Sequence, residues 1–179
     1  MHPLRAVAIT NRHSRLRLDR RAVARVIHTL DTNRAAFRPS PIAHRLPAKG
    51  SATAGLSPTD ELSVVFLTDA ALAQLHADFL ADPTPTDVIT FAGDPAQGTA
   101  GEICVSADAA LRQISSIAHR PSPIAFSAEL TLYLVHGWLH LAGYDDLQPA
   151  KKRRMRRAEA RAMKLLQAAT ALPRFSMRD

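Results

Sequence analysis

The stretch HGWLHLAGYDD, at residues 136–146, decides how the chain is interpreted. Its two histidines, His136 and His140, are four residues apart, so on a helix they share one face, about 5–6 Å apart at Cβ. Gly143 permits the left-handed residue that ends a helix, and the turn delivers Asp146 to the same side. Two imidazoles and one carboxylate, with a position left for water, form a normal catalytic zinc set. We therefore expect His136, His140 and Asp146 to bind a metal ion.

The same residues also allow interpretations other than a catalytic metal site. Histidine pairs at this spacing also occur by chance. Asp146 and Asp145 can together cap the helix that follows, and Asp145 is the reserve candidate for the third ligand. The spacing also matches the metzincin proteases, whose second motif residue is a glutamate that acts as general base. Because Gly137 stands at that position, a peptidase or similar small hydrolase is disfavoured.

The surrounding pattern predicts an α+β fold with a small mixed sheet of about four strands covered by helices. Strands are expected at 4–10, 61–67, 88–91 and 102–106, and helices at 19–30, 70–80, 107–119, 124–142 and 149–168. The chain of 179 residues suits one domain, 1–179, with a flexible loop at 38–58 that is rich in proline, serine, alanine and glycine. The metal site is expected between the histidine-bearing helix and the turn after it.

Composition restricts the classes of partner and compartment. No run of apolar residues approaches the ~18–20 that a membrane-spanning helix needs. The single cysteine, Cys104, excludes an internal disulfide, suits a reducing compartment and is expected to be a buried hydrophobe. A net charge of +7 and a pI near 10.5 favour polyanionic partners, which means nucleic acid or an acidic membrane surface.

The densest run of charge lies at 151–157. On a helix, an apolar stripe would face the core, and basic side chains would cover the other side with only Glu159 as counter-charge. The stripe comprises Met155, Ala158, Ala162, Leu165 and Ala169. We expect an RNA backbone to contact the basic side, and the alternative is a solvated face that serves solubility. The expected RNA-binding residues are Lys151, Lys152, Arg153, Arg154, Arg156 and Arg157.

Three blocks of the chain resemble the YbeY family of bacterial rRNA maturation factors. Residues 136–145 match its signature, H-G-x-L-H-L-x-G-Y-D-H, at every specified position. PTDVITF at 85–91 resembles the family's P-T-D-V-L-S-F, and GEICVS at 101–106 resembles its G-D/E-I-x-I-S/C strand. The blocks follow in the family's order, and the resemblance extends over about residues 61–166.

The resemblance implies a single-strand-specific, metal-dependent endoribonuclease that acts in maturation of the 16S rRNA 3′ end and in ribosome quality control. It also implies one Zn²⁺ per chain, rRNA and the small ribosomal subunit as partners, and a cytoplasmic location. Neither a small organic cofactor nor a membrane is expected. The alternative is a ribosome-assembly or rRNA-binding factor with a structural metal and little nuclease activity.

The chain departs from the family pattern at two positions. The third metal histidine is replaced by Asp146, which adds a negative charge and makes harder metals more competitive. The arginine that usually follows the aromatic residue Phe79 is replaced by Leu80. If that arginine stabilises the charged transition state, the cation must come from elsewhere in this chain. This second departure favours the assembly-factor alternative somewhat.

Glu129 is the candidate catalytic residue outside the metal set. It precedes His136 by seven residues, which places it two helical turns back on the same face. There it can orient a ligand histidine or act as a base. The alternative is a partly exposed glutamate without a role. Trp138 is expected to point away from the histidines into the core, and Asp87 is expected to stabilise a turn.

Overall fold

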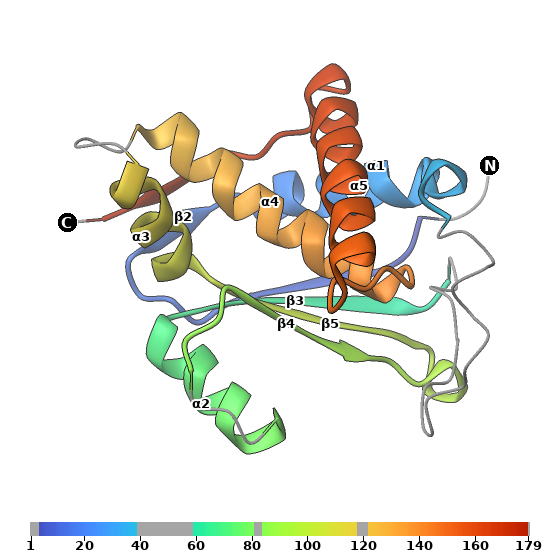
Figure 1. Ribbon diagram of the computed structural model, residues 1–179, viewed down its shortest axis with the longest axis horizontal. Coiled ribbons are helices and arrows are strands. Elements are labelled where there is room, and N and C mark those ends of the chain that lie inside the picture. The colour runs from blue at the N-terminus through green and yellow to red at the C-terminus, as the bar shows by residue number, and fades with distance from the viewer. Residues whose placement is uncertain (1–3, 39–58, 81–83, 118–121, 179) are drawn as a thin grey trace.

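The computed structural model describes residues 4–38, 59–80, 84–117 and 122–178, apart from the side chain of Leu80. It has the predicted α+β fold, a four-stranded mixed sheet with helices on both faces (Figure 1). The elements are β1 Val7–Asn11, β2 Leu16–Leu18, α1 Arg20–Thr32, η1 Arg34–Phe37, β3 Glu61–Leu67, α2 Asp69–Leu80, β4 Val88–Ala92, η3 Pro95–Gln97, β5 Thr99–Ser106, α3 Ala107–Ile117, α4 Pro123–Leu141, α5 Pro149–Ala168 and β6 Phe175–Met177. The loop expected at 38–58 lies, except for Arg38, outside the described residues. Within the described part of the chain, none of the helices combines the length and apolar content that crossing a membrane requires.

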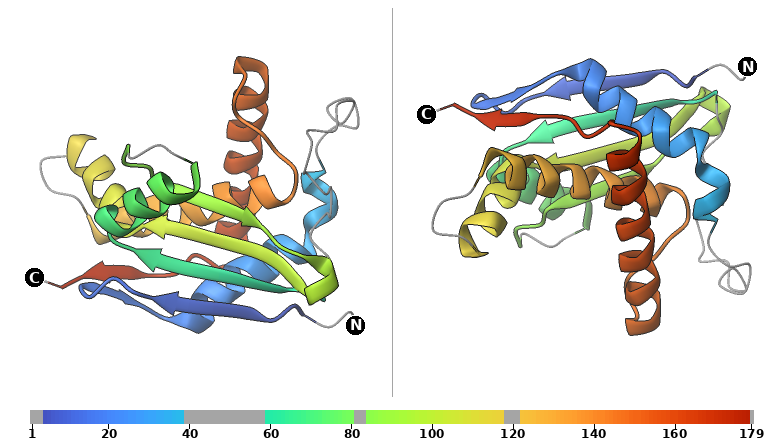
Figure 2. Two further views of the ribbon diagram at one scale, coloured as in Figure 1. Left: turned by 90° about the horizontal axis from the view of Figure 1, so that it is seen from below. Right: turned by 90° about the horizontal axis from the view of Figure 1, so that it is seen from above.

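The main sheet has the strand order β1-β3-β5-β4. β1, β3 and β5 run parallel, and β4 runs antiparallel to β5. Leu62, Val64 and Phe66 of β3 enter the main core, whereas Val65 and Leu67 enter a smaller cluster on the other face. Figure 2 shows α2 over one face and α1, α4 and α5 over the other. Because helices cover both faces, β3 is a nearly continuous apolar run rather than an alternating one.

Helix α4 runs through the main core and is anchored at Trp138. The Ser122 side chain caps its first turn. Trp138 is fully buried, its ring meets Phe37 edge-on, and its indole N–H donates to Asp31 at 3.0 Å. Asp31 also pairs with the buried Arg5. The core position predicted for Trp138 is therefore confirmed, and it is stabilised by the hydrogen bond to Asp31, itself paired with Arg5, as well as by packing.

The smaller cluster lies between the sheet and α2. It contains Leu72 of α2, Ile89 of β4 and Cys104 of β5. The expected burial of Cys104 is confirmed, since only 2% of the residue is exposed. Burial, followed by the neighbouring Glu102 carboxylate, raises the pKa of the Cys104 thiol to about 12. The thiol thus stays protonated and packs as a small hydrophobe.

The inward face of α5 differs from the predicted stripe at its C-terminal end. Met155, Ala158 and Ala162 are buried as expected, but Leu166 is the fourth buried residue. Leu165 is only half-buried, and Ala169 is exposed. At 100° per residue, Leu166 lies about 20° from Met155 around the helix axis, whereas Leu165 lies about 80° away. The 3-4-3-4 spacing therefore drifts off the face of a straight helix.

Two short strands that were not predicted from the sequence close the main core. β2 and β6 pair antiparallel, with Leu16 opposite Met177. Phe175 of β6 packs against Phe66 with ring centroids 5.6 Å apart. The Ser127 hydroxyl accepts from the Phe175 amide at 2.9 Å and lies 3.2 Å from its carbonyl oxygen. Strands of three residues are too short to show a period, so only these long-range contacts define them.

The turn that follows α5 contains a strained residue, which gives a stability prediction. Thr170 has φ = 52°, a left-handed conformation that is costly for a β-branched side chain. The Ala171 amide donates to the Leu166 carbonyl at 2.8 Å, as in helix ends that favour glycine. Thr170→Gly is therefore expected to raise the free energy of unfolding by about 1 kcal/mol, measured by chemical denaturation. Ala169→Gly, at a right-handed position, is the control and should lower stability instead.

Candidate metal centre

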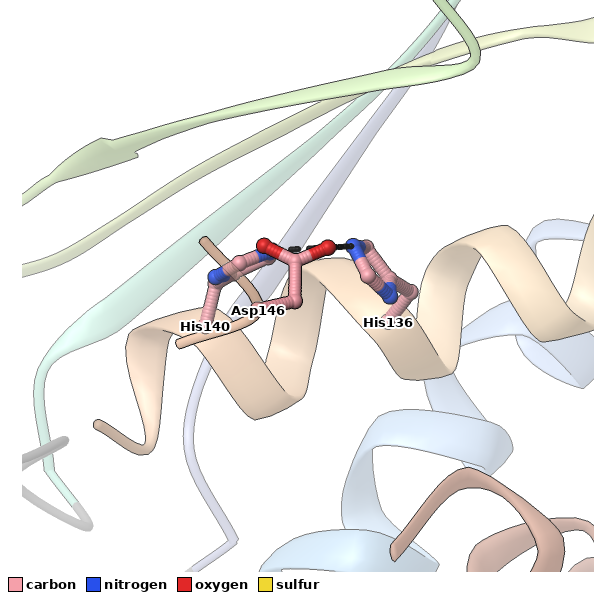
Figure 3. Close-up of side chains that lie close together, drawn as sticks. All are labelled: His136, His140 and Asp146. Atoms are coloured by element: carbon pink, nitrogen blue, oxygen red, sulfur yellow. Dashed lines mark hydrogen bonds and ion pairs between the residues drawn. The ribbon is translucent and has the colours of Figure 1, made fainter. Parts of the chain in front are cut away.

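One helix and the turn after it bring three candidate ligands together. His136 and His140 lie on successive turns of α4. Gly143 follows the end of the helix with φ = 97°, the left-handed conformation that the sequence predicts. The amides of Gly143 and Tyr144 donate back to carbonyls in the last turn of α4 at 2.9 Å, which closes the turn. This turn carries Asp146 back over the two histidines (Figure 3).

The three groups have the geometry of a metal centre. The Nε2 atoms of His136 and His140 are 2.9 Å apart, and each lies 3.8 Å from a carboxylate oxygen of Asp146. All three ligand atoms lie within 4.8 Å of one another. Ligands ~2.0–2.2 Å from a tetrahedral zinc ion are themselves ~3.3–3.5 Å apart, so these distances fit one shared cation. The side chains are 20%, 27% and 31% exposed, which leaves one side open to solvent.

The partners of the other ring nitrogens leave both Nε2 atoms free to bind a cation. Nδ1 of His136 lies 2.6 Å from the Glu159 carboxylate, and Nδ1 of His140 lies 3.2 Å from the Tyr144 carbonyl oxygen. Both partners only accept hydrogen bonds, so each Nδ1 carries the proton. Each Nε2 then presents a lone pair, and two lone pairs at 2.9 Å repel unless a proton or a metal ion lies between them.

The electrostatic surroundings of the two histidines differ. Burial lowers the pKa of His136, but the hydrogen bond and charge of Glu159, with the charges of Asp146 and Asp87, outweigh it and raise the pKa overall. Burial, followed by the neighbouring His136, lowers the pKa of His140 despite the charge of Asp146. The site is therefore strongly negative around His136, and that charge favours any cation bound there.

Asp145, the reserve ligand, points away from the histidines. Its carboxylate accepts from the Leu147 amide at 2.8 Å and from Lys151 Nζ at 2.6 Å. The Leu147 hydrogen bond and then Lys151 lower the pKa of Asp145. Helix α5 begins after Gln148 without a side-chain cap, so neither aspartate caps it. Asp146 is thus the aspartate that the structure brings to the histidines.

Glu129 lies two turns before His136 on α4, but its partner is not a histidine. It forms a side-chain hydrogen bond with Tyr133. Burial, and then the nearby charge of Asp87, raise the pKa of Glu129 in spite of that bond. The carboxylate that contacts the His136 ring is Glu159 of α5. Of the two roles considered for Glu129, the contact needed to orient a ligand histidine is made by Glu159, and the acid–base role of Glu129 stays a proposal.

Glu159 was predicted from the sequence only as a counter-charge, although its position carried a signal. Glu159 follows Met155 by four residues and precedes Ala162 by three, and both are buried against the core. An acidic side chain on the apolar side of a basic helix is unusual unless it has a partner. That partner comes from α4, 23 residues earlier in the sequence, so local spacing did not reveal it.

Gly137 explains why the second motif position holds no catalytic glutamate. A Cβ atom added there would lie 2.6 Å from Ile103 Cγ2 and 3.2 Å from Thr90 Cγ2. This side of α4 presses against β4 and β5, whereas the histidine side faces Asp146. A glutamate at this position would enter the sheet interface, so the peptidase alternative loses its general base for a structural reason.

Helix α5, which carries the six predicted RNA-binding residues, projects beyond the body of the protein (Figure 2). Lys151 is half-buried and pairs with Asp145. The other five side chains are exposed, and no ion pair holds them within the described residues: Lys152, Arg153, Arg154, Arg156 and Arg157. From Glu159, Lys152 and Arg156 lie about 20° and 60° around the helix axis, which places these two nearest the metal centre.

The fold and the site together define a class. The protein is an α+β protein with an H-x₃-H pair on a helix and a carboxylate in the following turn, which is consistent with a zincin-like metal site. The family model described as endoribonuclease YbeY matches residues 40–167. The chain therefore belongs to the YbeY endoribonuclease family, as its sequence motifs indicate.

Individual relatives agree with this assignment. Endoribonuclease YbeY of Chlamydia abortus is 40% identical over 119 residues, which cover 64% of this chain and 74% of that protein. The YbeY protein of Rhodopirellula baltica is 39% identical over 99 residues, 55% of this chain and 50% of that protein. The solution structure of TM1509 from Thermotoga maritima has the same fold, with a TM-score of 0.54 at 17% identity over 91% of this chain and 90% of that one.

The contact beneath Gly137 gives a second stability prediction. Gly137→Ala gains about 1 kcal/mol of helix propensity, but its Cβ overpacks the interface with Ile103. We expect a net loss of about 1–2 kcal/mol in the free energy of unfolding, measured by urea denaturation. The same change in an Ile103→Ala background should cost less, because the contacting methyl group is gone. Equal costs in both backgrounds would show that the loss does not come from this contact.

Proposed function

We propose that the protein is a metal-dependent endoribonuclease specific for single-stranded RNA, acting at the 3′ end of 16S rRNA and in ribosome quality control. Membership of the YbeY endoribonuclease family supports the class of reaction. The observation that carries the proposal is the convergence of two Nε2 lone pairs and the Asp146 carboxylate within 4.8 Å. The proposed partners are rRNA and the small ribosomal subunit, and the proposed location is the cytoplasm, where such a substrate would be met.

The proposed cofactor is one Zn²⁺ per chain, held by His136, His140 and Asp146. When bound, the ion supplies Lewis acidity toward a phosphodiester. Asp146 contributes an anionic oxygen where a third histidine would contribute a neutral nitrogen, so Mn²⁺ and other hard cations compete better here. Glu129, whose pKa is raised by burial, is the proposed acid–base residue because it lies on the same face of α4 as the histidines.

The proposed RNA-binding surface is the basic face of α5. Its exposed side chains carry charge that nothing in the described part of the chain neutralises by ion pairing. A phosphate backbone lying on this helix would release counterions and pass the metal centre beside Lys152 and Arg156. Aromatic residues make up only 5% of the chain, so contacts with the backbone and with RNA shape should outweigh base stacking.

The second candidate function is an rRNA-binding assembly factor in which the metal is structural. The observation that favours it is Leu80, which stands where the family usually has an arginine. The Leu80 side chain lies outside the described residues. Under this alternative the basic face of α5 would bind RNA, but the metal centre would not contribute to cleavage.

Removal of a ligand tests the metal centre. His140→Ala and Asp146→Ala are each expected to lower bound zinc from about one ion per chain to below a tenth, measured by elemental analysis. Cleavage of single-stranded RNA should fall in parallel, whereas Glu129→Gln should retain the metal and lose activity. Full zinc occupancy in His140→Ala would contradict the ligand set. A wild-type protein that binds zinc and RNA but does not cleave single-stranded RNA would favour the assembly-factor function instead.

Paired charge removals on α5 test the RNA surface. Lys152→Gln/Arg156→Gln is expected to weaken binding of single-stranded RNA at least tenfold at low salt. It should also reduce the slope of log affinity against log salt by about 1.4. Arg153→Gln/Arg157→Gln removes the same charge from the side of α5 turned away from Glu159 and should have a smaller effect on cleavage. Unchanged affinity in both double variants would point to a solubility role.

A further inference from the structure

Glu159 is the one acidic residue of α5, and it is turned inward. Its helix carries eight lysines and arginines between Pro149 and Ala168. Arg156 and other basic neighbours are available to it, yet within the described residues its ion pair is with Nδ1 of His136 at 2.6 Å. The Glu159 side chain is 16% exposed. The preference of Glu159 for an imidazole over the cations of its own helix agrees with its inward, largely buried position.

The distance between Nδ1 of His136 and the Glu159 carboxylate marks a strong, directional contact. A separation of 2.6 Å between nitrogen and oxygen is short for a hydrogen bond, and charged acceptors such as carboxylates shorten these contacts. Because a carboxylate only accepts, the contact fixes the proton on Nδ1 and the plane of the ring. His140 has a weaker arrangement, since its Nδ1 donates to a neutral backbone carbonyl at 3.2 Å. The two ligand histidines are thus oriented by groups of different charge.

We propose that Glu159 is a positioning residue for the metal centre: it holds His136 with Nε2 unprotonated and aimed at the shared cation, and it strengthens Nε2 as a ligand. A carboxylate behind a ligand histidine raises the basicity of the ring. Together with Asp146, it also places two negative charges around a divalent cation. This inference rests on the proposed metal centre, but its first test does not need a metal.

The first test reads the protonation of each ring nitrogen in the metal-free protein. Long-range ¹H–¹⁵N spectra at mildly alkaline pH should show the wild-type His136 ring protonated at Nδ1. In Glu159→Ala, His136 should move toward the Nε2-protonated form, which predominates in free imidazole side chains. Glu159→Gln keeps a carbonyl oxygen at the same reach and should retain more of the wild-type form. His140 is the internal control, because its carbonyl partner remains in all variants.

The second test measures metal affinity by competition with a chromophoric zinc chelator. Glu159→Ala is expected to bind zinc 10–100-fold more weakly than the wild type, with Glu159→Gln between the two. Gln167→Ala, which removes an exposed side chain from the same helix, should bind as the wild type does. Thermal unfolding of each apo variant verifies that the fold is retained, so a loss of affinity cannot be assigned to unfolding.

The outcomes separate this inference from the proposed function. Wild-type affinity together with an unchanged His136 ring in Glu159→Ala would overturn the positioning role and leave the metal centre intact. A shift of the His136 proton from Nδ1 to Nε2, together with weakened zinc binding, would establish the positioning role. If the wild type itself failed to bind zinc or manganese, the metal centre would be rejected, and the ring spectra would still decide whether Glu159 fixes His136.

Discussion

The whole site depends on how closely α4 packs against the sheet. Gly137 allows this approach, because any side chain there would meet Ile103 of β5 and Thr90 of β4. Trp138, the next residue, is buried and bound to Asp31, which prevents the helix from rotating about its axis. With its rotation fixed, α4 must present His136 and His140 on the side that faces α5 and the turn carrying Asp146.

The centre is completed by two elements that come after α4 in the chain. The left-handed Gly143 reverses the chain so that Asp146 lies over the histidines, and Lys151 holds the adjacent Asp145 away from them. Helix α5 then crosses α4 and contributes Glu159 from its inward side. The ligands are thus local in sequence, whereas Glu159, which contacts the His136 ring, and Lys151, which pairs with Asp145, come from α5.

The features that the sequence predicts are likewise local, and the features that it misses come from distant segments. The strands of the main sheet, the long helices and the turn at Gly143 were predicted correctly, because periodicity and glycine placement are local signals. The choice of Asp146 over Asp145 follows from contacts with Leu147 and Lys151, which spacing alone did not settle. The partner of Glu159 and the pairing of β2 with β6 depend on contacts between distant segments, so local patterns do not identify them.

The two sides of α5 have a consequence for how this protein can evolve. Arg153, Arg154 and Arg157 lie about 120–160° around the helix axis from Glu159, so these three arginines can be exchanged without disturbing the inward carboxylate. Selection can therefore adjust the attraction for a polyanion, and its sensitivity to salt, over many steps while the inner centre stays constant. One helix in this way separates the strength of polyanion binding, which is free to vary, from the geometry of the metal centre, which is tightly constrained.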